Sequence, residues 1–238
     1  MKKLWLMLLF SPVPMLYYGF FLQDFYILKQ IGGLEVFSNL TLILYYIQSK
    51  KRKDFASIDA YLIEALLYTI VGAVLIFLFN DNLLLMFIHT VGFYLTHFMY
   101  INVFRSEGSV LPALSTLMQE WKIISLTVLF FVGLVFLLIT YTPNSLLLIS
   151  FVYSTQMMLL CWMAYFRPIP QIAFSFGFLG VFFMVISNLW LAINLLYQSL
   201  CHSITIYYIL YSSAQFLIVE SVLYNQKLKS VSSPLNNQ

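Results

Sequence analysis

The chain has 238 residues, of which 62% are hydrophobic and only 9% are charged. About a quarter of the residues in a soluble domain are charged, so this composition excludes a water-soluble fold. Long apolar runs without strict alternation favour membrane-spanning helices, since lipid cannot satisfy an exposed backbone. The formal net charge is only +3, and we expect no nucleic-acid partner. We therefore predict an all-α integral membrane protein.

Eight apolar segments are separated by charged residues, Pro, Gly and Asn, and nearly all are long enough to cross a bilayer. In chain order they cover residues 4–22, 33–48, 58–79, 83–104, 123–141, 145–166, 172–198 and 203–224. They predict a single transmembrane helical domain over residues 1–226. The second segment is the shortest, and we expect it to extend back toward Ile31. The first segment also has the form of a signal peptide, whose removal would leave seven spans.

The basic residues indicate how these spans are oriented. If the spans alternate in direction, eleven Lys and Arg residues lie on one side of the membrane and only Lys29 lies on the other. Basic residues accumulate in cytoplasmic loops, so we expect both termini in the cytoplasm of a cell with a bacterial-type inner membrane. Residues 227–238 then form a short polar cytoplasmic tail. Anionic lipid headgroups are the expected contacts of one basic cluster, Lys50, Lys51, Arg52 and Lys53.

Ionisable residues inside the spans are the first place to look for function, because each costs free energy on insertion into the bilayer. The third and fourth spans form a hairpin around Asp81. Glu64 is 17 residues before Asp81 and His97 is 16 residues after it. Antiparallel helices can therefore bring Glu64 and His97 together near the cytoplasmic side. Two interpretations remain open: the pair handles protons, or it is a structural pair that locks the hairpin.

A second polar group is expected in the outer half of the membrane. Glu35 and Asn39 are four residues apart and share one helical face. Asp81 lies at the hairpin, His89 about two turns below it, and Asn188 at a similar depth on the seventh span. Together these groups can line a polar cavity that opens toward the outer leaflet. The alternative for each is structural: an interfacial carboxylate, a helix cap or turn, a core histidine, and a polar contact between helices.

Two other residue types receive no functional role. Tyrosine pairs near span ends, including Tyr45–Tyr46 and Tyr207–Tyr208, are expected to anchor helices at the membrane interface. The two cysteines, Cys161 and Cys201, have no metal-binding or redox spacing, so we expect no metal site.

Three stretches carry short motifs in span order. Gly180-Val-Phe-Phe-Met-Val-Ile-Ser-Asn-Leu189 is followed by Tyr208-Ile-Leu-Tyr-Ser-Ser-Ala-Gln-Phe-Leu-Ile-Val219. The others are Val91-Gly-Phe-Tyr-Leu-Thr-His-Phe-Met-Tyr100 and Phe37-Ser-Asn-Leu-Thr-Leu42. Together they resemble the YhhN-like, or lysoplasmalogenase, family of eight-span membrane proteins. The last stretch has Ser38-Asn39 where the family usually has Lys-Pro.

The resemblance implies hydrolysis of the vinyl-ether bond of a lysophospholipid, without a cofactor. Such a reaction needs an acid that protonates the vinyl-ether carbon and a carboxylate that stabilises the cation or activates water. By the resemblance, the family's two candidate aspartates map onto Asp81 and Asn188. An amide cannot exchange a proton at neutral pH, so Glu35 is a replacement carboxylate and His89 an alternative acid or base.

The sequence thus predicts a lysoplasmalogenase-like membrane hydrolase whose activity is retained, altered or lost through the change at Asn188. The alternative is a non-catalytic lipid-binding or proton-coupled transport protein. The expected partner is a membrane lipid, and the oligomeric state stays open.

Overall fold

The computed structural model describes residues 27–50, 55–78, 82–111, 119–141, 144–196 and 203–232, and all regular secondary structure in these ranges is α-helical. The helices are α3 (Ile27–Ser49), α4 (Ser57–Leu78), α5 (Asn82–Ser106), α7 (Trp121–Tyr141), α8 (Asn144–Tyr165), α9 (Gln171–Leu196) and α10 (Ser203–Ser232). Each helix from α4 to α9 begins and ends within two residues of its predicted segment. The predicted segment at 4–22 lies outside the described residues.

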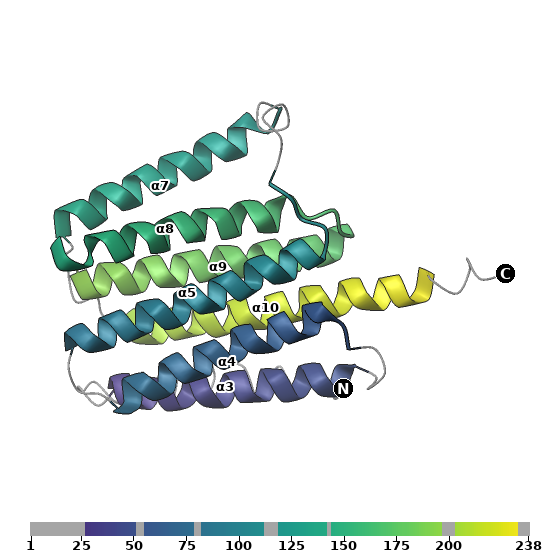
Figure 1. Cartoon of the computed structure of the whole chain (residues 1–238), viewed down its shortest axis with the longest axis horizontal. Coiled ribbons are helices and arrows are strands. Elements are labelled where there is room, and N and C mark those ends of the chain that lie inside the picture. Colours follow the sequence, from purple (N-terminus) through teal and green to yellow (C-terminus); the bar gives the residue numbers. More distant parts are fainter. Residues whose placement is uncertain are drawn as a thin grey trace.

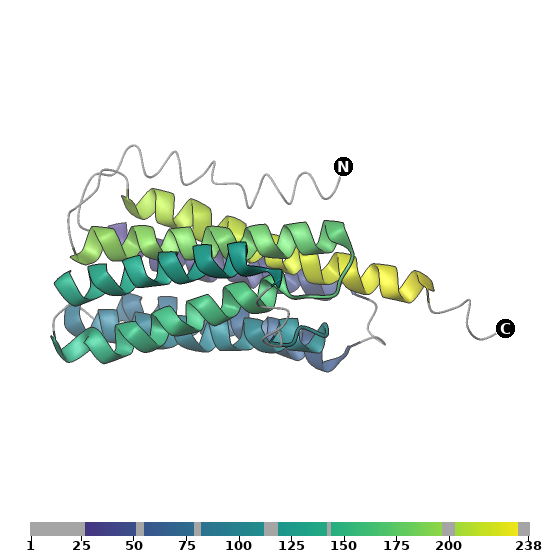
Figure 2. The same cartoon turned by 90° about the horizontal axis from the view of Figure 1, so that it is seen from above.

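The first and last of these helices extend past their predicted bounds. α3 begins at Ile27 rather than at residue 33, so the short second segment is extended in the expected direction. α10 continues to Ser232, which makes the first part of the predicted polar tail helical. Lys227–Ser230 are exposed there, and Figure 2 shows this end of α10 projecting beyond the neighbouring helices.

Six of the helices pack in a closed ring. Each helix contacts the next in the order α3, α4, α5, α8, α9 and α10, and α10 contacts α3 to close the ring. α7 packs against α8, and Figure 1 shows it at the edge of the bundle. The axes of all the helices are roughly aligned in this view. The ring therefore encloses an interior to which each of its six helices contributes one face.

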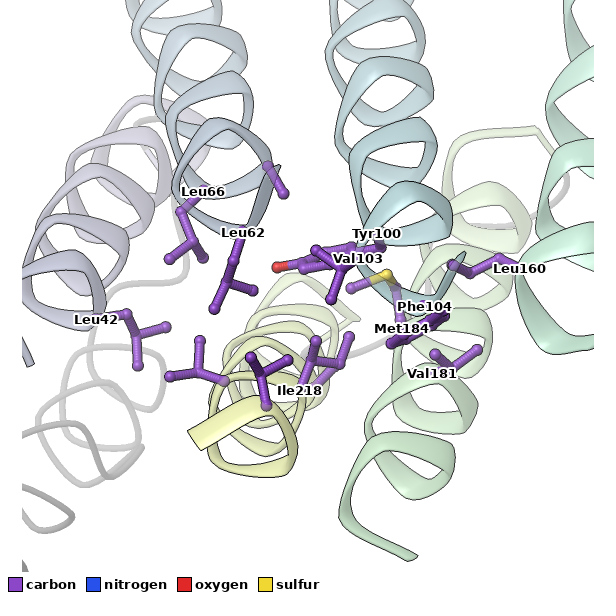
Figure 3. Close-up of a cluster of buried hydrophobic side chains, with 14 of the residues drawn as sticks. Leu42, Leu62, Leu66, Tyr100, Val103, Phe104, Leu160, Val181, Met184 and Ile218 are labelled. Carbon is purple, nitrogen blue, oxygen red and sulfur yellow. The ribbon is translucent and has the colours of Figure 1, made fainter. Parts of the chain in front are cut away.

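The core of this ring is apolar where the helices come closest together. Figure 3 shows side chains from all six ring helices meeting there. They include Leu42, Leu62, Leu66, Tyr100, Val103, Phe104, Leu160, Val181, Met184 and Ile218. The Tyr100 hydroxyl lies within this apolar cluster and donates a hydrogen bond to Gln215 Oε1. This hydrogen bond joins α5 to α10 inside the core.

Small residues allow α4 and α5 to approach closely. A Cβ atom at Gly92 would lie 3.3 Å from the Gly72 Cα atom. One turn further along, the Thr69 and Thr96 Oγ1 atoms are 3.1 Å apart. Close approach at Gly and Thr is typical of helices that associate in a membrane, where packing and interhelical hydrogen bonds replace the hydrophobic driving force.

The outer surface of the bundle is apolar. On α7, Leu129, Phe136 and Ile139 are each more than 60% exposed. Three described helices contain stretches long and apolar enough to cross a membrane: Ser57–Leu75, Gln171–Leu191 and Thr205–Ser230. A water-soluble protein rarely exposes so much contiguous apolar surface. The chain is therefore a membrane protein.

One end of the bundle carries all the described basic residues except Lys29, which lies at the start of α3. These residues are Lys50, Arg105, Lys122, Arg167, Lys227 and Lys229. They lie where α3, α5, α8 and α10 end and where α7 begins, and Figure 1 shows these helix ends together on the right. Hydrogen bonds between Asn225 and Glu107 and between Tyr165 and Glu120 connect them. We call this the basic end.

Candidate functional site

Glu35 places a carboxylate inside the ring. Glu35 is only 3% exposed, and the Tyr207 hydroxyl on α10 donates a hydrogen bond to Glu35 Oε1 over 3.1 Å. Asn39, one turn along α3, donates from Nδ2 to the Glu35 carbonyl oxygen over 2.8 Å. The prediction that Glu35 and Asn39 share one helical face is confirmed. That face points into the bundle, so the alternative of an interfacial carboxylate is wrong.

Aromatic side chains from α5 and α10 surround this carboxylate. Tyr207 is 2% exposed and stacks on Tyr211, with ring centroids 5.6 Å apart. Phe93 contacts both rings edge-on, at 6.4 Å from Tyr207 and 5.0 Å from Tyr211. The expectation that Tyr207–Tyr208 anchors the membrane interface is therefore wrong. A tyrosine can be buried when its hydroxyl finds a polar partner, and Glu35 supplies one for Tyr207.

His97 completes this arrangement on α5. The residue is fully buried, stacked on Phe93 with ring centroids 6.1 Å apart and tilted against Tyr153 of α8 at 5.4 Å. Neither ring nitrogen has a hydrogen-bond partner among the described residues. We refer to the group as the buried centre, which consists of Glu35, Phe93, His97, Tyr153, Tyr207 and Tyr211.

The predicted pair of Glu64 and His97 is not formed. Thr69 lies opposite Thr96, and Gly72 lies opposite Gly92. The same register places His97 opposite residues 67–68, about one helical turn from Glu64. The prediction was wrong because it set the register from a pivot at Asp81, whereas the Gly and Thr contacts fix it about three residues away.

A hydrogen-bonded group lies next to the buried centre. Gln215 Nε2 donates to Thr69 Oγ1 over 3.3 Å, and Thr69 Oγ1 is 3.4 Å from the Tyr211 hydroxyl. Thr96 also contacts Thr69, and its hydroxyl donates to the Gly92 carbonyl oxygen over 3.0 Å. These groups are bound to one another, whereas the two nitrogens of His97 are not.

Asn188 lies on the side of α9 that faces α10. Gly180 packs against Ala214 and Ile218, and this antiparallel register places Asn188 level with Tyr207 and Tyr208. Asn188 is therefore close in depth to Glu35, as predicted. It is buried, and neither of its side-chain polar atoms has a hydrogen-bond partner among the described residues. The two predicted site residues share a depth without hydrogen bonding to each other.

Several other predicted residues cannot be placed in the same way. Asp81 lies outside the described residues, as do Lys51, Arg52 and Lys53. His89 lies within α5, but its side chain is not among those described. The predicted convergence of Asp81 and His89 with Glu35 and Asn188 therefore stays a prediction.

A second polar cluster lies at the basic end, and sequence reasoning missed it. Arg167 Nη1 donates to Glu107 Oε2 over 2.8 Å, with both side chains fully buried. Asn225 Nδ2 donates to Glu107 Oε1 over 2.9 Å, and Arg167 Nη1 also donates to Ser221 Oγ over 3.2 Å. We call Glu107, Arg167, Ser221 and Asn225 the basic-end network. It ties the end of α5 and the α8–α9 connection to α10.

Local backbone structure positions this network. Gly108 has a positive φ of 97°, and hydrogen bonds from Gly108 N to Arg105 O and from Ser109 N to Phe104 O close the end of α5. This pattern is a Schellman motif, which favours glycine at the left-handed position. It directs Glu107 toward Arg167. Burial lowers the pKa of the Arg167 guanidinium, and the charge of Glu107 opposes that shift.

A third buried carboxylate joins α3, α4 and α10 at the same end. Asp59 accepts hydrogen bonds from the Tyr46 hydroxyl, the Ala56 backbone N–H and Gln226 Nε2, and it forms an ion pair with Lys50. Lys50, predicted to contact lipid headgroups, is thus partly used inside the protein. The α10 residues that bind Asp59 and Glu107 are adjacent in sequence, so α10 closes the basic end.

The fold and the buried centre define a helical membrane protein with a carboxylate, an imidazole and several phenols enclosed in a six-helix ring. A sequence model of the YhhN family matches residues 33–222, which is most of the chain and all six ring helices in part. The protein belongs to the YhhN family. Comparisons with curated proteins and with solved structures give no significant match.

Proposed function

We propose that the protein is a lysoplasmalogenase-like membrane hydrolase that cleaves the vinyl-ether bond of a lysophospholipid. Membership in the YhhN family is consistent with this activity. The observation that carries the proposal is Glu35, a buried carboxylate that accepts a hydrogen bond from Tyr207 inside the bundle. Glu35 offers an acid–base group at the depth of Asn188. The resemblance implies an aspartate at position 188, where this chain has an asparagine.

The chemistry needs proton transfer to carbon and the addition of water. A carboxylic acid protonates the outer vinyl carbon, and water adds to the resulting oxocarbenium carbon. The hemiacetal then breaks its bond to the glycerol oxygen, which releases a fatty aldehyde and a glycerophospho compound with a free hydroxyl. Glu35 or Asp81 supplies the acid, and the other carboxylate stabilises the cation. The Asn188 amide orients the water but cannot accept its proton, so that proton returns to the carboxylate that protonated the vinyl carbon.

The membrane arrangement in this proposal has eight spans with both termini in the cytoplasm of a bacterial-type inner membrane. The gathering of Lys and Arg at one end of the bundle supports the sidedness. The buried centre then lies nearer the middle of the membrane than the basic end does. Anionic headgroups would contact the basic cluster of residues 50–53 on the cytoplasmic side.

One observation favours a second candidate, a non-catalytic lipid-binding or proton-coupled transport protein. Asn188 stands where the family often has an aspartate, and its amide has no hydrogen-bond partner among the described residues. An amide in this position can hold a lipid hydroxyl or phosphate oxygen without chemistry. This candidate requires lipid to co-purify or to be moved without chemical change.

Lipid mass spectrometry separates the two candidates. Purified protein is incubated with a panel of alkenyl, alkyl and acyl lysophospholipids, and the aldehyde and glycerophospho products are measured. The hydrolase predicts products from the alkenyl lipid, less product with Asp81→Asn, and more with Asn188→Asp. Absence of turnover across the whole panel would overturn the hydrolase and support the binding protein.

A further inference from the structure

Thr69 joins the contact between α4 and α5 to the face of α10 that carries Tyr207. The residue is 2% exposed. Its Oγ1 atom accepts a hydrogen bond from Gln215 Nε2 over 3.3 Å and lies 3.4 Å from the Tyr211 hydroxyl. The same atom is 3.1 Å from Thr96 Oγ1 on α5. One hydroxyl of α4 thus holds two side chains of α10 while it also takes part in the α4–α5 contact.

The hydrogen-bonding capacity of the Thr69 hydroxyl sets the direction of these bonds. A hydroxyl has one proton to donate and two lone pairs that accept. Thr69 donates to the Ala65 carbonyl oxygen of its own helix over 3.2 Å, so its lone pairs are available to donors on other helices. The Tyr211 hydroxyl is therefore the donor in its contact with Thr69. Valine at position 69 would deprive that phenol of this acceptor.

Tyr100 fixes the orientation of Gln215. Gln215 is 1% exposed, and its Oε1 atom accepts a hydrogen bond from the Tyr100 hydroxyl, which Figure 3 shows directed into the interior of the ring. Because α5 holds the amide oxygen, the amide nitrogen points toward Thr69 on α4. Hydrogen bonds therefore run from Tyr100 through Gln215 to Thr69, and the Tyr211 hydroxyl joins them there. Side chains of three helices hold the hydroxyl end of Tyr211 in place.

Tyr211 in turn restrains Tyr207. Residues 207, 211 and 215 are four apart, so they lie on one face of α10. The rings of Tyr207 and Tyr211 stack with centroids 5.6 Å apart and planes at 18°, and Phe93 packs edge-on against both. The Tyr211 ring cannot tilt without lengthening its bond to Thr69. Tyr207 therefore packs against a fixed ring while its hydroxyl donates to Glu35 over 3.1 Å.

Thr96 distinguishes this arrangement from simple packing of α4 against α5. It is buried in the same contact and bonds to Thr69 and to the carbonyl oxygens of Ala65 and Gly92. These partners are all on α4 and α5, whereas Thr69 also contacts α10. If Thr69 served only to pack α4 against α5, valine at position 69 or at position 96 would affect activity alike.

We propose that Thr69 is a positioning residue for the hydrolysis: through Tyr211 it holds the Tyr207 hydroxyl on the Glu35 carboxylate. This inference rests on the proposed function for the identity of the reaction. Correct placement of the reacting groups supplies a large part of enzymatic rate acceleration, and small displacements lose it. Thr69 itself touches neither the lipid nor Glu35 in this assignment, so its effect has to pass through Tyr207.

A double-mutant cycle measures that dependence. Thr69→Val should lower kcat for alkenyl lysophospholipid about fivefold with KM unchanged, an effect within the range of coupling inside one hydrogen-bond network. Thr69→Ser keeps the hydroxyl and should keep kcat, and Thr96→Val should keep it as well. In a Tyr207→Phe background, Thr69→Val should cause no further loss, because the hydroxyl that it positions is already gone. Additive losses, or equal losses in Thr69→Val and Thr96→Val, would overturn the inference.

A second measurement does not depend on turnover. Infrared difference spectra identify the absorption of the Glu35 carboxyl group as the band that Glu35→Gln removes. Thr69→Val should move this band toward its position in Tyr207→Phe, whereas Thr96→Val should leave it in place. An unmoved band in Thr69→Val would overturn the inference, while a moved band in a protein that hydrolyses no lipid would refute the hydrolase alone. If Thr69→Val does not fold, Tyr211→Phe removes the same hydrogen bond, and an unmoved band in that variant would be equally contradictory.

Discussion

The buried centre and the basic-end network both place ionisable groups inside a membrane bundle, yet they hold them differently. At the basic end, Glu107 is neutralised by Arg167 and also bound by Asn225. In the centre, the Glu35 carboxylate is bound by the neutral hydroxyl of Tyr207, and the described residues give it no ion pair. The ring nitrogens of His97 have no hydrogen-bond partner among the described residues. The first region is organised to hold helices together, whereas the second holds a carboxylate and an imidazole without a charged partner in the described part of the chain.

The comparison extends to the space around each group. Arg167 Nη2 also lacks a hydrogen-bond partner, but it lies directly against Gly177, where even a Cβ atom would collide with it. Its guanidinium stacks on Phe104, 4.2 Å from the ring centroid. That unpaired atom is enclosed by the protein itself. The unpaired ring nitrogens of His97 instead lie beside the aromatic rings of Phe93 and Tyr153.

The largest expected effect comes from breaking the ion pair of the basic-end network. Arg167→Ala leaves Glu107 buried without its charge partner, which should destabilise the fold by about 3–5 kcal/mol. Thermal unfolding in detergent measures this. Arg105→Ala removes an exposed arginine from the same end of the bundle and should change stability by less than about 0.5 kcal/mol. Equal losses in the two variants would show that the network has no special structural role.

A smaller loss of stability is expected from a single methyl group at Gly177. The added Cβ would lie 2.7 Å from Ser221 Oγ and would collide with the Arg167 guanidinium. Gly177→Ala should therefore destabilise the fold by about 1–3 kcal/mol, as overpacking usually does. Gly133→Ala is the matched control, because nothing lies within 4 Å of its added Cβ. Alanine favours the helix there, so the control should be neutral or slightly stabilising, and the same result at Gly177 would contradict the network.

Removing the phenol that binds Glu35 should affect activity more than stability. Tyr207→Phe keeps the ring contacts with Phe93 and Tyr211 but removes the hydrogen bond to the carboxylate. Turnover of alkenyl lysolipid should fall about tenfold, which corresponds to the loss of one hydrogen bond to a charged group. Tyr165→Phe, at the basic end, should leave turnover unchanged. A tenfold fall in both variants would point to a general effect on folding.

The smallest expected effect concerns the contact that sets the register of α4 and α5. Thr96→Val keeps the shape of the side chain but removes the hydrogen bond to Thr69. Interhelical hydrogen bonds of this kind contribute about 0.6 kcal/mol in membrane proteins. Thr140→Val is the control, since Thr140 is exposed and donates only to its own helix at Phe136. A loss of stability above about 2 kcal/mol would mean that Thr96 contributes more than one interhelical hydrogen bond.

Local sequence predicts the helices well because an apolar run and its interruptions are properties of neighbouring residues. The bounds of α4 to α9 follow from charges, prolines and glycines next to each run. The faces of the helices are harder. Glu35 and Asn39 were predicted to share a face because their spacing of four residues requires it. Their depth relative to Asn188 followed from helix direction alone.

Contacts between distant helices could not be predicted in the same way. Glu107 and Arg167 are 60 residues apart, and Glu35 and Tyr207 are 172 apart. Their meeting depends on the register and rotation of whole helices, which a local pattern of apolar and polar residues does not specify. The arginine was interpreted as a topology signal and the tyrosine as an interfacial anchor, and both interpretations are common for those residue types near span ends. A buried partner is the feature that neither pattern contains.

The central claim is that Glu35 acts in the buried centre as an acid–base group. The most direct test compares the turnover of alkenyl lysophospholipid by Glu35→Gln and Glu64→Gln, two isosteric changes in carboxylates on adjacent helices. We predict that Glu35→Gln lowers kcat by about 10²-fold or more while thermal stability is kept, and that Glu64→Gln leaves kcat unchanged. Full activity in Glu35→Gln would contradict the account, because the hydrolysis would then proceed without the carboxylate on which the proposal depends.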